Sequence, residues 1–273
     1  MSILSSLSDT GGRSPVDAWV VNLAGLRGEG FRRVWMTQMP YEPDLLTVLG
    51  IVLREVDTLE VATGVVPIQV QHPMQLAQRA LTLSLIGDGR FILGLGMSHR
   101  VVTEQMWGIS FDKPVRRMRE YLDGLLPLLA GEPADAVGET VSTRGALQIP
   151  GAPTPDVYIA AMGPQMLRLA GRRSAGTVTW MTGPKTLAKH IGPTLREAAA
   201  EAGRADGTCG WLVRYRSASP TTQRARGRRP PSSSRCTPVC RRIARCWTAR
   251  GSPDPRTPRS SATSRPWRIA STN

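Results

Sequence analysis

The sequence predicts an α/β fold, a TIM-type (β/α)8 barrel that is incomplete after its sixth βα unit. Short β-branched or apolar runs alternate with amphipathic segments of helical length, which is the pattern of βα units around a parallel sheet. Six such units occupy about 205 residues, so a chain of ordinary barrel length leaves room for two more. A doubly wound open sheet is the alternative architecture.

The predicted strands are short runs rich in Val, Ile, Leu, Thr or Phe. The third run, TLEVATGVVPI, is unusually long, and the fourth, FILGLG, ends in a glycine. Apolar, β-branched runs bounded by glycine or polar residues are typical of buried parallel strands. In chain order the strands are residues 2–7, 32–37, 58–68, 91–96, 155–163 and 177–182.

Each strand is followed by a segment with apolar residues at spacings of three and four, as a helix packed on one face requires. Several of these segments carry a proline in their first turn, where its missing N–H is tolerated. In the fourth, the apolar face is Val115, Met118, Leu122, Leu125 and Leu129. We predict an insertion with a small hairpin over residues 136–152. The predicted helices are residues 15–28, 42–56, 72–87, 114–131, 164–176 and 185–204.

Two unrelated compositions share the chain. Residues 1–208 hold 20 basic and 20 acidic residues, whereas residues 209–273 hold 15 arginines and one acid, Asp254, and so carry the whole net charge of +14. All four cysteines follow residue 208 and all three phenylalanines precede it. We therefore divide the chain into a barrel domain, 1–208, and an Arg-, Ser- and Pro-rich tail, 209–273, predicted to be disordered.

The tail has several interpretations. A basic arm would bind nucleic acid through its phosphates, and this gives the protein a non-enzymatic alternative function. The spacing of Cys236, Cys240 and Cys246 matches no zinc pattern. A third reading explains more: arginine, serine and proline without lysine are what a GC-rich gene yields when it is translated out of frame.

The out-of-frame reading can be tested on the residues themselves. Shifted by one base, codons allowed for residues 240–251 translate as PSYRAMLDREG, a helix-like segment. We predict a frameshift at about residues 208–218. The chain as written then lacks the elements that close the barrel, and we expect it to be poorly soluble or inactive.

The active site of a barrel lies at the carboxyl ends of its strands. The residues there contain no carboxylate pair, no Cys-His pair and no cluster with metal-ligand spacing, so the chemistry of a bound cofactor fits the site best. The segments at the strand ends are 37–38, 64–65, 96–99, 162–165 and 181–183.

Four polar side chains and one turn are candidates for function. His99 follows the glycine-rich fourth strand and either donates a proton or caps a loop. His72 is first a helix-start residue, and Gln38 and Glu104 are further candidates near strand ends. In AAMGPQML, Gly163-Pro164 forms either a phosphate cradle at a helix N-terminus or a plain strand-to-helix turn.

Taken together, EVATGVVPIQVQHPMQLAQRALTLSLIGDGRFILGLGMSH, KPVRRMREYLDGLLPLL, VYIAAMGPQMLRLAG and GTVTWMTGP resemble the bacterial-luciferase-like superfamily, and within it the branch that uses the deazaflavin coenzyme F420. The resemblance runs over about residues 1–208. It implies a barrel with an insertion after strand four and an oxidoreductase that moves a hydride between F420 and a small organic substrate. An FMN-dependent monooxygenase of the same fold is the enzymatic alternative.

The resemblance also assigns positions. Gly64-Val65 would be a strand-three bulge with a non-prolyl cis peptide behind the cofactor ring. Gly96, Met97 and Ser98 would line the ring. Ala161, Met162, Gly163 and Gln165 would hold the phosphate-bearing tail of the cofactor. His99 or a water would supply a proton, and Gln38 stands where some relatives have a histidine or an acid.

The remaining expectations concern location and assembly. The N-terminal residues lack a secretory pattern and no window approaches about 18 uninterrupted apolar residues, so we expect a cytoplasmic protein without a membrane segment. The resemblance implies a homodimer if the C-terminus were intact. We expect a small-molecule substrate, no specific nucleic-acid partner and no metal.

Overall fold

The computed structural model describes residues 2–5, 15–204 and 210–214. Every described residue belongs to one unit of the chain, 1–216. The tail beyond residue 214, with three of its cysteines, lies outside the described residues, as do residues 208–209 and 215–218 of the segment in which we predict the frameshift.

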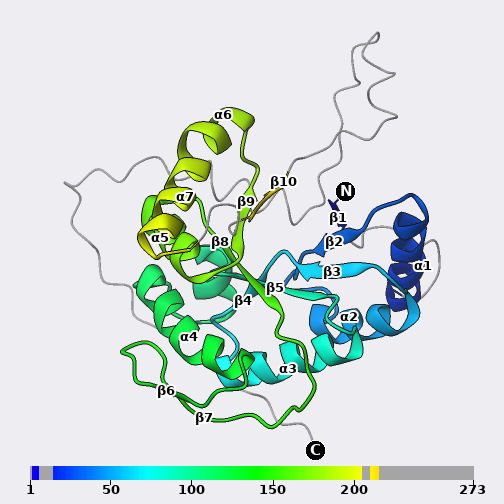
Figure 1. The fold of residues 1–273 in the computed structure, drawn as a ribbon, viewed down its shortest axis with the longest axis horizontal. Coiled ribbons are helices and arrows are strands. Elements are labelled where there is room, and N and C mark those ends of the chain that lie inside the picture. Colours follow the sequence, from blue (N-terminus) through cyan, green and yellow to red (C-terminus); the bar gives the residue numbers. More distant parts are fainter. Residues whose placement is uncertain (1, 6–14, 205–209, 215–273) are drawn as a thin grey trace, which may run out of the picture. The chain divides into compact units, whose positions relative to one another are not determined.

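The strands form one curved parallel sheet in which neighbours in space follow the order of the chain (Figure 1). The order is β1-β2-β3-β5-β8-β9-β10, and the short β4 pairs with β5. Among the described strands, β1 and β10 each have a single neighbour and do not pair with each other. The strands are β1 Ser2–Ser5, β2 Arg33–Met36, β3 Glu60–Thr63, β4 Val66–Pro67, β5 Phe91–Gly96, β8 Asp156–Ala160, β9 Gly176–Trp180 and β10 Gly210–Arg214.

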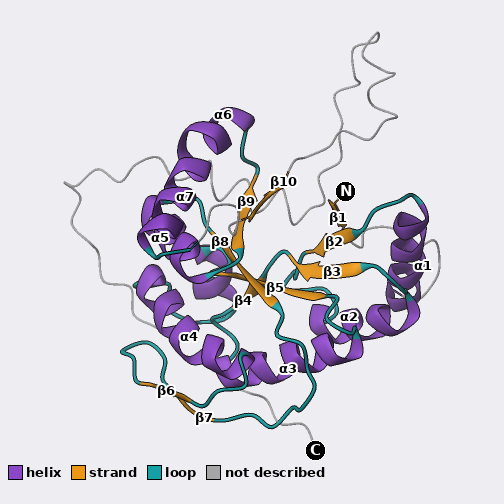
Figure 2. Ribbon diagram, in the orientation of Figure 1, coloured by secondary structure: helices purple, strands orange, loops and turns teal. Residues whose placement is uncertain are grey.

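The helices cover the outer, convex side of this sheet (Figure 2). They are α1 Pro15–Gly28, α2 Leu45–Glu55, α3 Pro73–Ile86, α4 Pro114–Leu129, α5 Pro164–Arg173, α6 Pro184–Thr186 and α7 Gly192–Glu201, with π-helical turns η1 Val102–Met106 and η2 Leu187–Ile191. An antiparallel hairpin, β6 Ala134–Ala136 and β7 Thr143–Gly145, follows α4.

The strands bury two separate apolar clusters. The larger one lies between the sheet and the helices. The smaller one lies on the concave side, which is the interior of a barrel. There Trp35 and Tyr158 meet edge to face with ring centroids 5.0 Å apart. The interior cluster is Trp35, Ala62, Ile92, Tyr158 and Val178.

The structure confirms the predicted architecture of sequential βα units and an incomplete barrel. The long predicted strand 58–68 is instead two strands, broken at a cis peptide between Gly64 and Val65. The helix predicted over 42–56 begins at Leu45 because Asp44 Oδ2 accepts a hydrogen bond from the Thr47 amide, 2.9 Å away. The seventh strand, β10, falls at the start of the segment assigned to the tail.

Arg90 ties the end of α2 to the sheet. Its guanidinium donates three hydrogen bonds to backbone carbonyl oxygens, of Leu53 at 2.7 Å, Leu59 at 2.9 Å and Val56 at 3.0 Å. Two of these carbonyls, of Leu53 and Val56, lie at the C-terminus of α2, which carries partial negative charge.

We therefore expect Arg90→Met to lower the free energy of unfolding by about 3 kcal/mol, because it leaves three carbonyls without their charged donor. Chemical denaturation measures this. Arg54→Met, an exposed position on the same α2, is the matched control and should change stability by less than about 0.5 kcal/mol. Equal losses in the two variants would contradict the role of Arg90.

Candidate functional site

The carboxyl ends of the strands form a mouth with a floor of small residues. The inward positions of β5 are Ile92, Gly94 and Gly96. The two positions nearer the mouth therefore have no side chain beyond a hydrogen atom. A Cβ added to Gly96 would overlap a methyl group of Val65 and lie 3.5 Å from the Cβ of Ala160. Val65, Gly96 and Ala160 are therefore close together at the strand ends, and a Val65 methyl group fills the space that a side chain at position 96 would need.

The break between β3 and β4 lies on this floor. The Gly64 amide donates a hydrogen bond to Met36 O on β2 at 2.6 Å. One residue earlier, Thr63 Oγ1 donates to Gly94 O at 2.9 Å and accepts from the Gly94 amide at 2.7 Å. The peptide Gly64-Val65 is cis, as the resemblance implied, and it is fixed to strands on both sides.

The loop after β5 forms one wall. Met97 is buried, and its carbonyl accepts a hydrogen bond from Gln69 Nε2. Ser98 adopts the left-handed conformation, φ 55°, and His99 follows it. The His99 ring is exposed and packs edge to face against Trp180, at the end of β9, with centroids 6.5 Å apart. His99 thus stands on the rim of the mouth with its ring accessible to a ligand.

The opposite wall is the start of α5. Gly163 is its N-cap residue and supplies no side-chain cap, and a Cβ placed there would meet nothing within 4 Å. Ala161 is buried, whereas Met162, Gly163 and Gln165 are exposed. A helix N-terminus with open space at its first turn can accept an anionic group. His190 Nε2 donates to Met162 O at 3.2 Å and thereby braces this rim.

Three other sequence candidates have structural partners. Gln38 Oε1 accepts from the Leu45 amide at 2.8 Å and so caps α2. His72 is the N-cap of α3: its Nδ1 accepts from the Met74 amide at 3.2 Å, while its Nε2 donates to Ser142 O at 2.9 Å. Glu104 pairs with Arg100 at 2.5 Å. The structure therefore gathers His99 and the proposed cofactor residues at the mouth, and uses Gln38 and His72 to fix helix starts.

Two polar atoms near the mouth were not singled out from the sequence. Thr37 Oγ1 and Gln69 Oε1 are buried and have no hydrogen-bond partner among the described residues. Thr37 lies two residues beyond the interior Trp35, and Gln69 bonds the loop after β5. A buried polar atom without a partner costs stability unless something satisfies it. The only signal in the sequence for this pair was the position of Thr37 at the end of a strand.

The mouth is suited to a flat, neutral ring. Its floor consists of small and apolar residues, and among the described residues no group of three His, Cys, Asp or Glu side chains could hold a metal ion. The unsatisfied atoms of Thr37 and Gln69 offer a hydroxyl and a carbonyl oxygen to polar edges of such a ring. The residues present therefore fit a flavin-like cofactor.

Fold and site together define a βα-barrel protein with a cofactor-type site at the carboxyl ends of its strands. Residues 27–226 match the family model described as luciferase-like monooxygenase, and the chain belongs to that family.

The relatives with known activities include F420 enzymes. The chain is 30% identical over 157 residues to 5,10-methylenetetrahydromethanopterin reductase of Methanolobus tindarius, a match covering 58% of this chain and 48% of that protein. It is 30% identical over 177 residues to F420-dependent glucose-6-phosphate dehydrogenase of Microbacterium testaceum, covering 62% and 52%. The chain thus spans about half the length of the relatives it matches.

Solved structures share the fold. The F420-dependent tetrahydromethanopterin reductase of Methanopyrus kandleri superposes with a TM-score of 0.66 at 23% identity, covering 78% of this chain and 64% of that one. An oxygenating constituent of 3,6-diketocamphane monooxygenase from Pseudomonas putida, solved with FMN, superposes with a TM-score of 0.64 at 19% identity, covering 77% and 65%. None of the described helices has the length and apolar character needed to cross a bilayer.

Proposed function

We propose that this protein is an oxidoreductase that binds coenzyme F420 at the mouth of its barrel and transfers a hydride between it and a small organic substrate. The observation that carries the proposal is the floor of small residues, Val65, Gly96 and Ala160, in a chain whose relatives include F420-dependent enzymes. When bound, the deazaflavin ring supplies the hydride chemistry. The chain supplies position, polarity and a proton.

The roles we propose are those that the family resemblance implies for these positions. Gly64 and Val65 support one face of the ring, and Gly96, Met97 and Ser98 line its edge. Ala161, Met162, Gly163 and Gln165 hold the phosphate-bearing end at the start of α5. His99, exposed on the rim, or a water beside it holds the proton. Because its Oε1 caps α2, we expect Gln38 to position the segment after β2 rather than to touch the substrate.

Titration of the chain as written, and of a frame-restored chain in which the residues after about 213 are translated shifted by one base, with F420 and, separately, with FMN tests this proposal, with cofactor fluorescence as the readout. We expect saturable binding of F420 that is at least about tenfold tighter than that of FMN. Gly96→Ala should abolish binding because its Cβ overlaps Val65, whereas Gly25→Ala, in open space on α1, should leave it intact. Tighter binding of FMN would favour the monooxygenase alternative, and no binding of either cofactor by either chain would contradict the proposal.

Thr37 provides a second test. We expect Thr37→Val, which removes a buried hydroxyl without a partner, to leave the free energy of unfolding unchanged or raise it by up to about 1 kcal/mol. The same change should weaken F420 binding about fivefold if the hydroxyl bonds the cofactor.

The matched control is Thr63→Val, which removes a hydroxyl that bonds both the amide and the carbonyl of Gly94. It should lower the free energy of unfolding by about 2 kcal/mol. Chemical denaturation and the same fluorescence titration measure both variants. A Thr37→Val variant as unstable as Thr63→Val would show that the Thr37 hydroxyl has a partner within the chain.

A further inference from the structure

One large aromatic side chain stands at the mouth of the barrel, Trp180 at the end of β9. Side chains alternate along a strand and Val178 faces the barrel interior, so Trp180 faces it too, one layer nearer the mouth. Among the described side chains, Trp180 is therefore the aromatic one of this layer. The neighbouring strand ends carry smaller residues there: Thr37, Val65, Gly96 and Ala160.

Two methionines extend the surface that Trp180 begins. β8 pairs with β9 so that Ala160 lies opposite Val178, which places Met162 beside Trp180 two residues further along. Met181 follows Trp180 directly. Met162 is 48% exposed, Trp180 43% and Met181 63%. Neighbouring exposed apolar side chains mark a binding surface, and thioethers pack well against aromatic rings.

The turn after β9 is held in a strained conformation. Met181 has φ 46°, in the left-handed region that a residue with a Cβ enters only at a cost. The Thr182 hydroxyl fixes the turn by donating a hydrogen bond to Trp180 O at 3.0 Å. On the loop after β5, Ser98 is also left-handed and precedes His99, whose ring packs against that of Trp180. Strained residues thus adjoin both rings of this pair, and such residues cluster at ligand sites.

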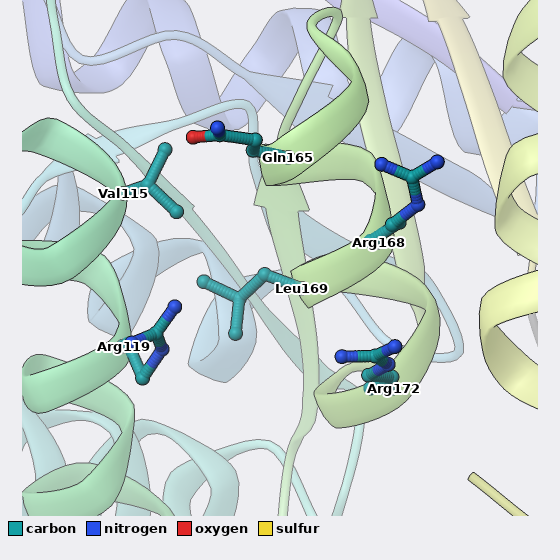
Figure 3. A pocket seen from close by; sticks show the side chains of 6 residues that line it. All are labelled: Val115, Arg119, Gln165, Arg168, Leu169 and Arg172. Atoms are coloured by element: carbon teal, nitrogen blue, oxygen red, sulfur yellow. The ribbon is translucent and has the colours of Figure 1, made fainter. Parts of the chain in front are cut away.

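The described strand ends at the mouth carry no charged residue; they are 37–38, 64–65, 96–99, 160–163 and 180–183. Arg100, next after them, pairs with Glu104 at 2.5 Å, and Lys185 is exposed in α6. An anion on the Trp180 surface would therefore lose its water without gaining a counter-charge there, which is costly. Three arginines of α4 and α5 line a groove outside the sheet instead: Arg119, Arg168 and Arg172 (Figure 3).

We propose that the substrate of this protein is an uncharged aromatic molecule, bound at the mouth against Trp180, Met162 and Met181. This inference rests on the proposed function: with Gly64 and Val65 against one face of the cofactor ring, the other face is left to the substrate. The Trp180 ring, held by that of His99, stacks with the substrate ring. The two flexible thioethers adapt to the rest of its outline.

Ligand-observed NMR titration of the F420-bound protein tests the inference, in the chain as written and in the frame-restored chain. The probes are three related ketones: acetophenone, cyclohexyl methyl ketone, whose ring is saturated, and 4-acetylbenzoate, which adds a carboxylate. Oxidised F420 cannot reduce a ketone, so binding is measured without turnover. We expect acetophenone to bind at least about threefold tighter than the saturated ketone and about tenfold tighter than 4-acetylbenzoate.

Variants of the surface locate the effect. Trp180→Leu keeps an apolar side chain but removes the ring, so the preference for acetophenone over the saturated ketone should disappear, whereas Trp180→Phe should retain it. Met181→Gly should weaken acetophenone binding about threefold without lowering the melting temperature, because glycine adopts this φ without strain. The matched control is Asp88→Gly, another left-handed residue, φ 49°, between α3 and β5, which should change the affinity for none of the probes.

Several results would overturn the substrate site alone. They are equal affinity for acetophenone and its saturated counterpart, tighter binding of 4-acetylbenzoate, no binding of any ketone to the F420-bound protein, and a Trp180→Leu variant that keeps the preference. F420 binding is followed in parallel by its fluorescence. Failure of F420 to bind either chain would overturn the proposed function and the substrate site together.

Discussion

Gly94→Ala is expected to lower the free energy of unfolding by about 3 kcal/mol or more and the melting temperature by on the order of 10 °C. A Cβ at this position would overlap the carbonyl oxygen of Thr63, which is backbone and cannot rotate away. The clash also separates Gly94 from the Thr63 hydroxyl, which bonds both its amide and its carbonyl. The strand end that carries Gly96 then moves away from Val65, so cofactor binding should fail as well.

Gly25→Ala is the control, since a Cβ there meets nothing within 4 Å and helix α1 gains propensity. It should raise stability by up to about 1 kcal/mol. Calorimetry of the two variants beside the parent chain measures both effects. A Gly94→Ala variant that melts within a degree or two of the parent would show that β3 and β5 are not held at the spacing described.

The second large effect is expected from restoring the reading frame. We define the frame-restored chain as residues 1 to about 213 followed by the translation of the same gene shifted by one base. Among the described strands, β1 and β10 each leave one edge without a partner. Exposed edges of parallel strands favour aggregation, and a barrel removes them by closing. We propose that the restored residues supply the missing strand and helices.

We expect the frame-restored chain to be soluble and to bind F420. The chain as written should be poorly soluble or should bind F420 much more weakly. Solubility on expression and the fluorescence titration measure the difference. The nucleotide sequence around residues 205–220, with an intact mass of the expressed protein, shows which frame is translated. Equal F420 binding by the two chains would contradict the proposal that the tail is out of frame.

The repeating units of the fold were predictable because each one is a local pattern. Alternating apolar runs and segments with period three to four fixed the order of strands and helices, and prolines marked the starts of α1, α3, α4 and α5. The π-helical turn η2 was missed because residues 187–191 keep the same apolar spacing as an ordinary helix. The start of α2 was misplaced because a cap, not the apolar period, sets it.

The position of the candidate site was predictable from the sequence, but the contacts of its side chains were not. Strand ends pointed to Gly96, His99 and Gly163 because a barrel brings those ends together. Gln38 caps α2 by accepting a hydrogen bond from the Leu45 amide, seven residues further along the chain. The sequence pattern did not indicate this bond. Arg119 is a surface charge in the sequence and becomes part of a groove only where α4 meets α5. Homodimer formation and cytoplasmic location stay predictions.

A crystal structure of the protein with F420 tests the central claim most directly. We predict the deazaflavin ring against Gly64 and Val65, its edge along residues 96–98, and its phosphate at the start of α5 beside Gly163 and Gln165. A ring bound elsewhere on the chain would contradict the account. So would a mouth left empty at an F420 concentration that saturates binding in solution.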